Sequence, residues 1–167
     1  MYRAICETYR VYCLSEIPDS PLMWAHYAGS HTGVCLEFDA LTAPFTRRTG
    51  ATKIKYRTTY PAHDIVTGYE FLITKSQDWS YEAEWRLIAE ERAFEIAPEP
   101  DDALRTDNDF LTLPSGVLKS VTIGCLADES SRRLIEHLVK THATNVLVRQ
   151  ATLASDRYEL RISPPLQ

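Results

Sequence analysis

Glycine is scarce in this sequence, with six residues among 167. Neither a G-x-G-x-x-G nor a G-x-x-x-x-G-K pattern occurs, and these patterns bring backbone N–H groups close to phosphate. A Rossmann-type dinucleotide site and a phosphate loop are therefore excluded. Long apolar runs are also missing, and no basic region followed by an apolar core stands at the start of the chain. We therefore expect a soluble protein with no membrane partner.

Spacings typical of metal sites are missing as well. The four cysteines form no C-x-x-C pair, and each has apolar or aromatic neighbours: Cys6, Cys13, Cys35 and Cys125. Free cysteine in such surroundings acts as a small hydrophobic residue, which is typical of a reduced, cytoplasmic protein. Two histidine pairs have a five-residue spacing that does not stack two side chains on one helical face: His26 with His31, and His137 with His142. We expect no metal site.

Basic residues are outnumbered, because 18 Lys and Arg stand against 23 Asp and Glu and give a net charge of -5. This balance does not indicate that the whole surface binds nucleic acid, although a local basic groove could still do so. With 44% hydrophobic and 25% charged residues, the composition is that of an ordinary globular protein. A chain of this length can bury one core, so we predict a single domain over residues 1–167.

Hydrophobic periodicity and turn residues predict a mixed α+β fold, with a mainly antiparallel sheet of about six to eight strands and about three helices. Strands are predicted at 9–14, 34–38, 53–60, 79–88, 118–124, 146–148 and 158–162. Helices are predicted at 22–28, 64–73 and 128–139, each preceded or begun by a capping residue: Ser20, Asp64 and Asp128. We expect strand 34–38 to be buried on both faces and segment 91–109 to form an acidic surface excursion.

The most informative segment is Trp79-Ser80-Tyr81-Glu82-Ala83-Glu84-Trp85-Arg86-Leu87-Ile88. As a strand it would direct Glu82, Glu84 and Arg86 to one face and the apolar and aromatic side chains to the other. Two like charges at i and i+2 repel each other unless they are compensated, and Arg86, a cationic ligand or a shared proton would each compensate them. The pattern therefore indicates either a structural ion network or a ligand site, and both interpretations stay open.

A second cluster of aromatic and titratable residues lies in the predicted helix 22–28 and just after it: Trp24, His26, Tyr27 and His31. Histidine titrates near neutral pH and can act as an acid, a base or a hydrogen-bond donor. Either Trp24 and Tyr27 are core aromatics beside a satisfied His26, or His26 is catalytic and the aromatics line its pocket. Ser-His nucleophilic catalysis is not indicated, because no G-x-S-x-G elbow occurs.

Two sequence signatures in the chain resemble those of a known family. The first comprises Val11-Tyr12-Cys13-Leu14-Ser15-Glu16, Leu22-Met23-Trp24-Ala25-His26-Tyr27-Ala28 and His31-Thr32-Gly33-Val34-Cys35-Leu36-Glu37-Phe38-Asp39, and the second is the segment 79–88. Together they resemble a bacterial family known only as a domain of unknown function, number 2971 in that series. Members of the family usually have an N-terminal Tyr-rich strand and an Asn-Asp-Pro-Phe-like turn. Neither precedes Tyr9, so we expect a short or N-terminally truncated member.

The Glu82-Ala83-Glu84 motif, followed by an apolar strand, is similar to the catalytic end of ADP-ribosyltransferases. That resemblance implies that Glu84 engages the nicotinamide ribose and stabilises the oxocarbenium-like state as nicotinamide leaves. Residues 12–15 would match the aromatic and serine strand that helps to hold NAD. An Arg or His on the first strand normally completes such a site, whereas Arg3 and Arg10 stand in no convincing motif here.

The first functional hypothesis is an enzyme that acts on NAD or a nucleotide, with Glu84, Glu82 and His26 as catalytic residues. Its ligand-binding residues would be Trp24, Tyr27, Ser15, Tyr81 and Arg86. NAD would be a substrate, and no prosthetic group is expected. The alternative is a non-catalytic module that binds an unidentified protein or small molecule and in which the charged residues form a structural ion network. A nuclease-like toxin of bacterial defence is a third hypothesis, drawn only from the genomes that such families inhabit.

Overall fold

The computed structural model describes residues 7–40, 51–60, 68–91, 105–106 and 108–166. The chain divides into two compact units, each assembled from two segments. Unit 1 comprises Met1–Glu16 and Ala40–Pro114, and unit 2 comprises Ile17–Asp39 and Ser115–Gln167. Each unit has a four-stranded sheet of its own. The single domain over residues 1–167 stays a prediction.

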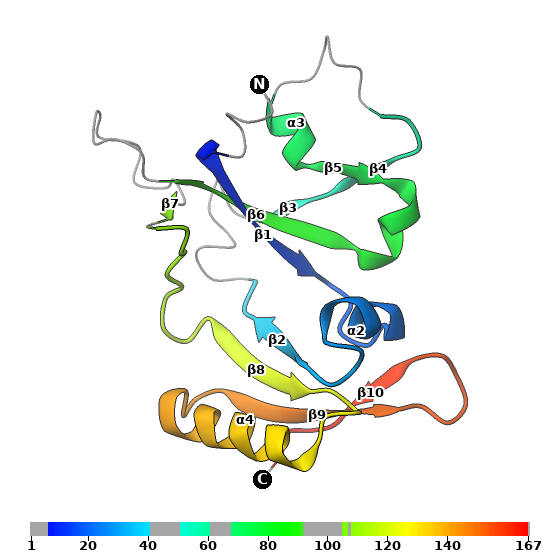
Figure 1. The fold of residues 1–167 in the computed structure, drawn as a ribbon, viewed down its shortest axis with the longest axis vertical. Helices are drawn as coiled ribbons and strands as arrows, with labels where there is room; N and C mark the ends of the chain where they lie inside the picture. The colour runs from blue at the N-terminus through cyan, green and yellow to red at the C-terminus, as the bar shows by residue number, and fades with distance from the viewer. Residues whose placement is uncertain (1–6, 41–50, 61–67, 92–104, 107, 167) are drawn as a thin grey trace. The chain divides into compact units, whose positions relative to one another are not determined.

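Unit 1 is built on the strand β6 (Glu84–Glu91), which has neighbours on both edges (Figure 1). Strand β1 (Tyr9–Ser15) pairs with it antiparallel and places Ser15 opposite Glu84 and Cys13 opposite Arg86. Two short strands also pair with β6: β3 (Thr52–Lys53) antiparallel and β7 (Arg105–Thr106) parallel. Leu87 and Ala89 are buried. Strand β6 is therefore the apolar centre of this sheet and carries Glu84 at its start.

A smaller sheet in unit 1 brings further side chains to the start of β6. Strands β4 (Lys55–Arg57) and β5 (Thr74–Ser76) pair in parallel. Helix α3 (Gly68–Leu72) precedes β5, and the 3-10 helix η1 (Gln77–Glu82) follows it and leads directly into β6. Ile54, the single residue that connects β3 to β4, is buried. Its N–H donates to the carbonyl of Glu84 at 3.0 Å. This bond ties the connection between β3 and β4 to the first residue of β6.

Unit 2 contains a sheet in the order β10-β9-β8-β2. Its strands are β2 (Val34–Phe38), β8 (Leu118–Ile123), β9 (Leu147–Leu153) and β10 (Leu160–Ile162). Strands β8 and β9 are parallel, and helix α4 (Glu129–His142) provides the long crossover that a parallel pair requires. The short helix α2 (Pro21–Tyr27) places Trp24 in a core cluster with Ala28, Ala151 and Leu160.

Particular residues explain the start of α2 and the turn after β8 in unit 2. The Ser20 side chain caps α2 by accepting from the N–H of Met23 at 3.5 Å, and Pro21 occupies the first helical turn, where its missing N–H is no loss. At the end of β8, a Cβ on Gly124 would lie 2.1 Å from the backbone oxygen of His31. Only glycine fits there, because the two backbone segments are in contact and the Gly124 N–H donates to the Gly33 carbonyl at 2.9 Å.

The structure confirms the α+β class and the mixed pairing, with four antiparallel pairs among the seven strand pairs in the described residues. The predicted strands at 9–14 and 118–124 are present, as are the helices that follow Ser20 and Asp128. The described part holds ten strands instead of six to eight, and several of them are only two or three residues long. Asp64, the predicted cap of helix 64–73, lies outside the described residues, as does most of segment 91–109.

Three predictions about strands are wrong. Segment 53–60 is not one strand, because the chain leaves the β6 sheet after Lys53 and pairs with β5 from Lys55 onward. Strand β2 is not buried on both faces: Leu36 is 43% exposed, since β2 is the end strand of its sheet. Segment 79–88 is a strand only from Glu84 onward, because residues before Ala83 form the 3-10 helix η1.

Candidate functional site

The predicted site residues fall into two groups that belong to different units. Unit 1 contains Ser15, Tyr81, Glu82, Glu84 and Arg86, and unit 2 contains Trp24, His26 and Tyr27. The first group comes together at the start of β6. The second group lies together on helix α2 of unit 2.

Glu82 and Glu84 are placed by the junction between η1 and β6. Glu82 ends the 3-10 helix, Glu84 begins the strand, and Ala83 between them has a left-handed backbone with φ 44° and ψ 51°. Both glutamates are only 3% exposed. The prediction that Glu82 and Glu84 lie at alternate positions of one continuous strand is therefore wrong. The turn at Ala83 nevertheless leaves both carboxylates buried in unit 1.

Lys75 of β5 compensates the negative charges of Glu82 and Glu84. Its ammonium group donates to Glu82 Oε2 and, at 2.9 Å, to Glu84 Oε2. Arg86, the predicted compensator, donates from Nε to Glu84 Oε1 at 2.6 Å and from Nη2 to Glu84 Oε2 at 3.3 Å. Lys75, Glu82, Glu84 and Arg86 thus form a cluster of two negative and two positive charges, which we call the ion network.

Hydrogen bonds to neighbouring elements fix the ion network in position. The Ser15 hydroxyl of β1 donates to the backbone carbonyl of Glu82 at 2.7 Å. The backbone N–H of Glu84 donates to the Tyr56 hydroxyl of β4 at 2.8 Å. Arg86 Nη1 donates to the carbonyl of Leu72, which ends α3, at 2.7 Å. The network therefore joins β1, β4, β5, β6, α3 and η1 of unit 1.

The pKa values follow from these contacts. Burial alone would raise the pKa of Glu84, but hydrogen bonds from Arg86, Cys13 and Lys75 lower it to about 2. Burial likewise opposes the charged form of Lys75, yet its bonds to the two carboxylates raise its pKa. Cys13 is exposed as a residue, and partial burial of its thiol together with the hydrogen bond to Glu84 raises the pKa of the thiol to about 11.

Aromatic rings lie beside the network. The Lys75 ammonium lies 5.0 Å from the centre of the Trp79 ring, within the range of a cation–π contact. The rings of Trp79 and Tyr81 are 6.0 Å apart and tilted by 36°. Trp79 is 38% exposed, so one ring next to the network is open to solvent.

The arrangement suits electrostatic stabilisation better than proton transfer. A carboxylate with a pKa near 2 stays ionised at neutral pH and is a poor general base, because an efficient base has a pKa near the working pH. Both oxygens of Glu84 already accept hydrogen bonds from cationic side chains. The side chain of Glu84 is 4% exposed, so the carboxylate is largely inaccessible to a substrate.

The unit 2 residues have separate roles. Trp24 is a core residue, and its indole N–H donates to the carbonyl of Pro18 at 2.7 Å. Tyr27 is 60% exposed, so its interpretation as a core aromatic is wrong: it lies on the outer side of a helix that buries Trp24. His26 is exposed, and its ring is 6.2 Å from that of Tyr27.

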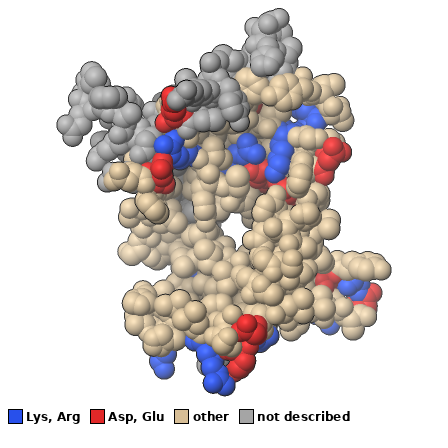
Figure 2. Space-filling view, viewed as in Figure 1, with Lys and Arg blue, Asp and Glu red and all other residues tan. Residues whose placement is uncertain are grey.

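Within the described residues, no group of three or more His, Cys, Asp or Glu is placed to hold a metal ion. The cysteines of that part are free thiols: Cys13, Cys35 and Cys125. No helix in the same ranges is both long and apolar enough to span a membrane. Figure 2 shows acidic and basic side chains lying next to one another on the displayed face, without a large patch of one sign.

Sequence reasoning missed Lys75 and Tyr56. Lys75 lies seven residues before Glu82, too far for a pattern of alternate positions to include it. A signal was nevertheless available, since Ser76 and Asp78 form a typical helix start and the Ser76 side chain accepts from the Asp78 N–H at 3.4 Å. That cap would have predicted a turn between Lys75 and the glutamates. Nothing in the sequence around Tyr56 indicates its bond to Glu84.

Comparison with known proteins gives one finding. A family model described as "Protein of unknown function (DUF2971)" matches residues 23–87, a range that begins within α2 and includes the whole ion network. Neither the curated proteins nor the solved structures provide a match.

Proposed function

We propose that this member of the DUF2971 family is a non-catalytic module that binds a protein or a small molecule, and that the ion network holds its unit 1 together. One observation supports this proposal most strongly: Glu82 and Glu84 are buried and fully compensated by Lys75 and Arg86. A catalytic carboxylate must reach its substrate, whereas two neutralised carboxylates whose side chains are 3–4% exposed are typical of a structural network.

The charge of Glu84 is compensated within unit 1. Its carboxylate accepts from Arg86, from Lys75 and from the Cys13 thiol, and these three contacts, which lower its pKa, all come from unit 1. The balance of charge needs no external cation. A ligand that bound at Glu84 would have to displace one of these partners and leave a buried cation unpaired, which is costly.

A thermal-shift panel tests the proposal. Wild type and Glu84→Gln are each melted with NAD, ADP-ribose, nicotinamide and nucleotides, because a ligand that binds only the folded state raises the melting temperature by mass action. We expect the variant to melt at a lower temperature and the panel to leave both proteins unshifted. Stabilisation of wild type by NAD that is lost in Glu84→Gln would overturn the proposal.

A second candidate function is an enzyme that acts on NAD or a nucleotide, with NAD as a substrate. The specific observation in its favour is the pair of rings, Trp79 and Tyr81, beside the partly exposed Lys75, because a planar base or nicotinamide ring can stack on such a surface. Under this hypothesis Glu84 stabilises developing positive charge as an ionised carboxylate, a role that needs no proton transfer.

The two functions differ in what they predict for turnover. The enzyme hypothesis predicts that NAD is consumed by wild type, that Glu84→Gln abolishes consumption, and that Trp79→Ala weakens NAD binding. The module hypothesis predicts no consumption by any of the three proteins. Activity that survives fully in Glu84→Gln would exclude Glu84 as a catalytic residue even if an enzyme is present.

A further inference from the structure

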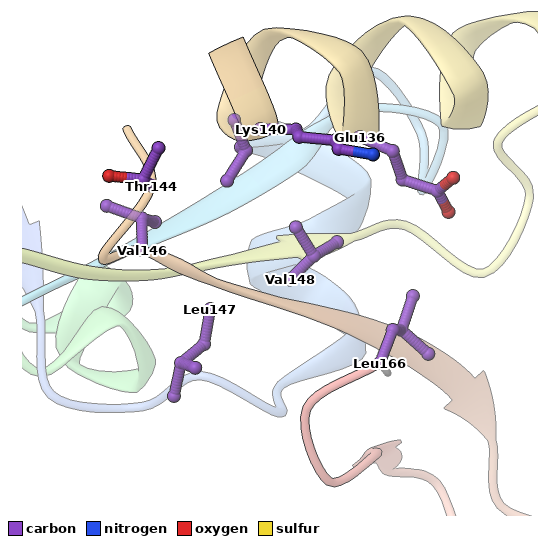
Figure 3. Close-up of a pocket in the computed structure, with 8 residues that line it drawn as sticks. Glu136, Lys140, Thr144, Val146, Leu147, Val148 and Leu166 are labelled. Carbon is purple, nitrogen blue, oxygen red and sulfur yellow. The ribbon is translucent and has the colours of Figure 1, made fainter. Parts of the chain in front are cut away.

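Unit 2 has a groove between helix α4 and strand β9 that the ion network does not involve. Its volume is about 280 Å³, close to the lower end of small-molecule sites, about 300–1,000 Å³. Figure 3 shows Val146, Val148 and Leu166 along the strand side of the groove and Glu136 and Lys140 on the helix side. The groove therefore has an apolar floor and a charged rim.

The floor exposes aliphatic surface to water. Leu166 is 44% exposed. The backbone N–H of Leu166 donates to the Val148 carbonyl at 2.7 Å, which holds Leu166 beside β9. An aliphatic group of a ligand would cover this surface, and burying apolar area is favourable.

The rim carries one charge of each sign in a position to pair, yet the two groups do not pair. Glu136 and Lys140 stand at i and i+4 on α4, the spacing and order that favour an ion pair. On the same helix, Glu129 and Arg133 have the same spacing and are bonded at 2.8 Å. Among the described residues, Glu136 and Lys140 have no ion pair or hydrogen bond, so both head groups are available at the edge of the groove.

We propose that this groove binds a free amino acid with an aliphatic side chain. The ligand ammonium pairs with Glu136, its carboxylate pairs with Lys140, and its side chain covers the apolar floor. The match rests on charge complementarity, because only a ligand with adjacent charges of both signs and an apolar tail satisfies the whole groove. The inference names a ligand class for the proposed binding function, and it does not depend on the ion network.

Titration calorimetry with L-leucine and three analogues tests the proposal on the whole chain. 4-Methylpentanoate lacks the ammonium, isoamylamine lacks the carboxylate, and glycine lacks the tail. We expect saturable binding of L-leucine at concentrations on the order of 10 mM or below. 4-Methylpentanoate and isoamylamine should each bind about two- to fivefold more weakly, which is the range that an exposed ionic contact contributes. Glycine should also bind more weakly, because it has no side chain to cover the apolar floor. Absence of saturable L-leucine binding would overturn the proposal.

Matched variants separate the two ionic contacts. Glu136→Gln should weaken L-leucine binding about two- to fivefold and leave 4-methylpentanoate unaffected, whereas Lys140→Gln should weaken L-leucine binding to a similar extent and leave isoamylamine unaffected. Glu129→Gln, on the same helix but outside the groove, serves as the control and should bind L-leucine like wild type. Equal effects of Glu129→Gln and Glu136→Gln, or equal binding of L-leucine and 4-methylpentanoate, would refute the zwitterionic ligand. Absence of L-leucine binding would not change the outcome of the stability test on the ion network, so each of the two proposals can be refuted without the other.

Discussion

Replacing Glu84 by glutamine tests the ion network most directly, because the side chain keeps its shape and loses its charge. The cluster would change from two negative and two positive charges to one negative and two positive. Arg86 is 15% exposed and Lys75 is 22% exposed at the side chain, so the uncompensated charge would be only partly solvated. We expect the free energy of unfolding to fall.

The magnitude follows from the pKa of Glu84. A decrease from the ordinary value of 4.5 to about 2 corresponds to about 3 kcal/mol of preferential stabilisation of the ionised form in the folded state. Solvent near Lys75 screens part of this energy, so we expect Glu84→Gln to cost about 1–3 kcal/mol at neutral pH.

Urea denaturation followed by circular dichroism measures this loss. Glu70→Gln is the control within unit 1, because Glu70 pairs with Lys55 at 3.2 Å on an exposed part of the surface. An exposed pair contributes about 1 kcal/mol or less, so the control should stay close to wild type. A Glu84→Gln variant as stable as the control would refute the structural role of the network.

Three further predictions concern the same two units. The contribution of Glu84 to the free energy of unfolding should be fully present above pH 4.5 and lost as the pH falls towards 2, because the pKa of Glu84 is lowered in the folded state. In urea titrations, the difference in unfolding free energy between wild type and Glu84→Gln should therefore shrink over that pH range. Ala83→Gly should raise the unfolding free energy by up to about 1 kcal/mol, since glycine adopts the left-handed backbone without strain, and a decrease would contradict this. Gly124→Ala should lower the free energy of unfolding by about 1–3 kcal/mol, because the new Cβ would clash with the backbone oxygen of His31. A melting temperature equal to that of wild type would contradict this clash.

The elements that the sequence predicts well are those with local signals. Ser20 and Pro21 mark the start of α2, and Asp128 marks the start of α4, because capping depends on residues only three positions apart. Periodicity over residues 118–123 likewise predicts a strand whose four last residues are all buried. These features need no knowledge of distant parts of the chain.

The remaining features depend on partners that are distant in sequence or on a change of backbone within a pattern. The break at Ile54 arises because β4 finds its partner in β5, about twenty residues later. The aromatic and acidic residues at 79–82 have the composition of a strand, but the Ser76 cap and the left-handed Ala83 convert them into a 3-10 turn. For the site, the pairing of Arg86 with Glu84 follows from spacing, whereas Lys75 reaches the glutamates only through that turn.

The order of the segments in the two units has a consequence for synthesis on the ribosome. The chain enters unit 1, passes into unit 2 at Ile17, returns to unit 1 at Ala40 and ends in unit 2. Unit 1 has all its segments once residue 114 has emerged, whereas β2 must wait for β8, which supplies Ser120 opposite Glu37. Unit 1 can therefore fold during translation, while the nascent β2 remains without its sheet partner until the last third of the chain appears. A single cut cannot separate the two units, because any one break leaves at least one of them without a segment.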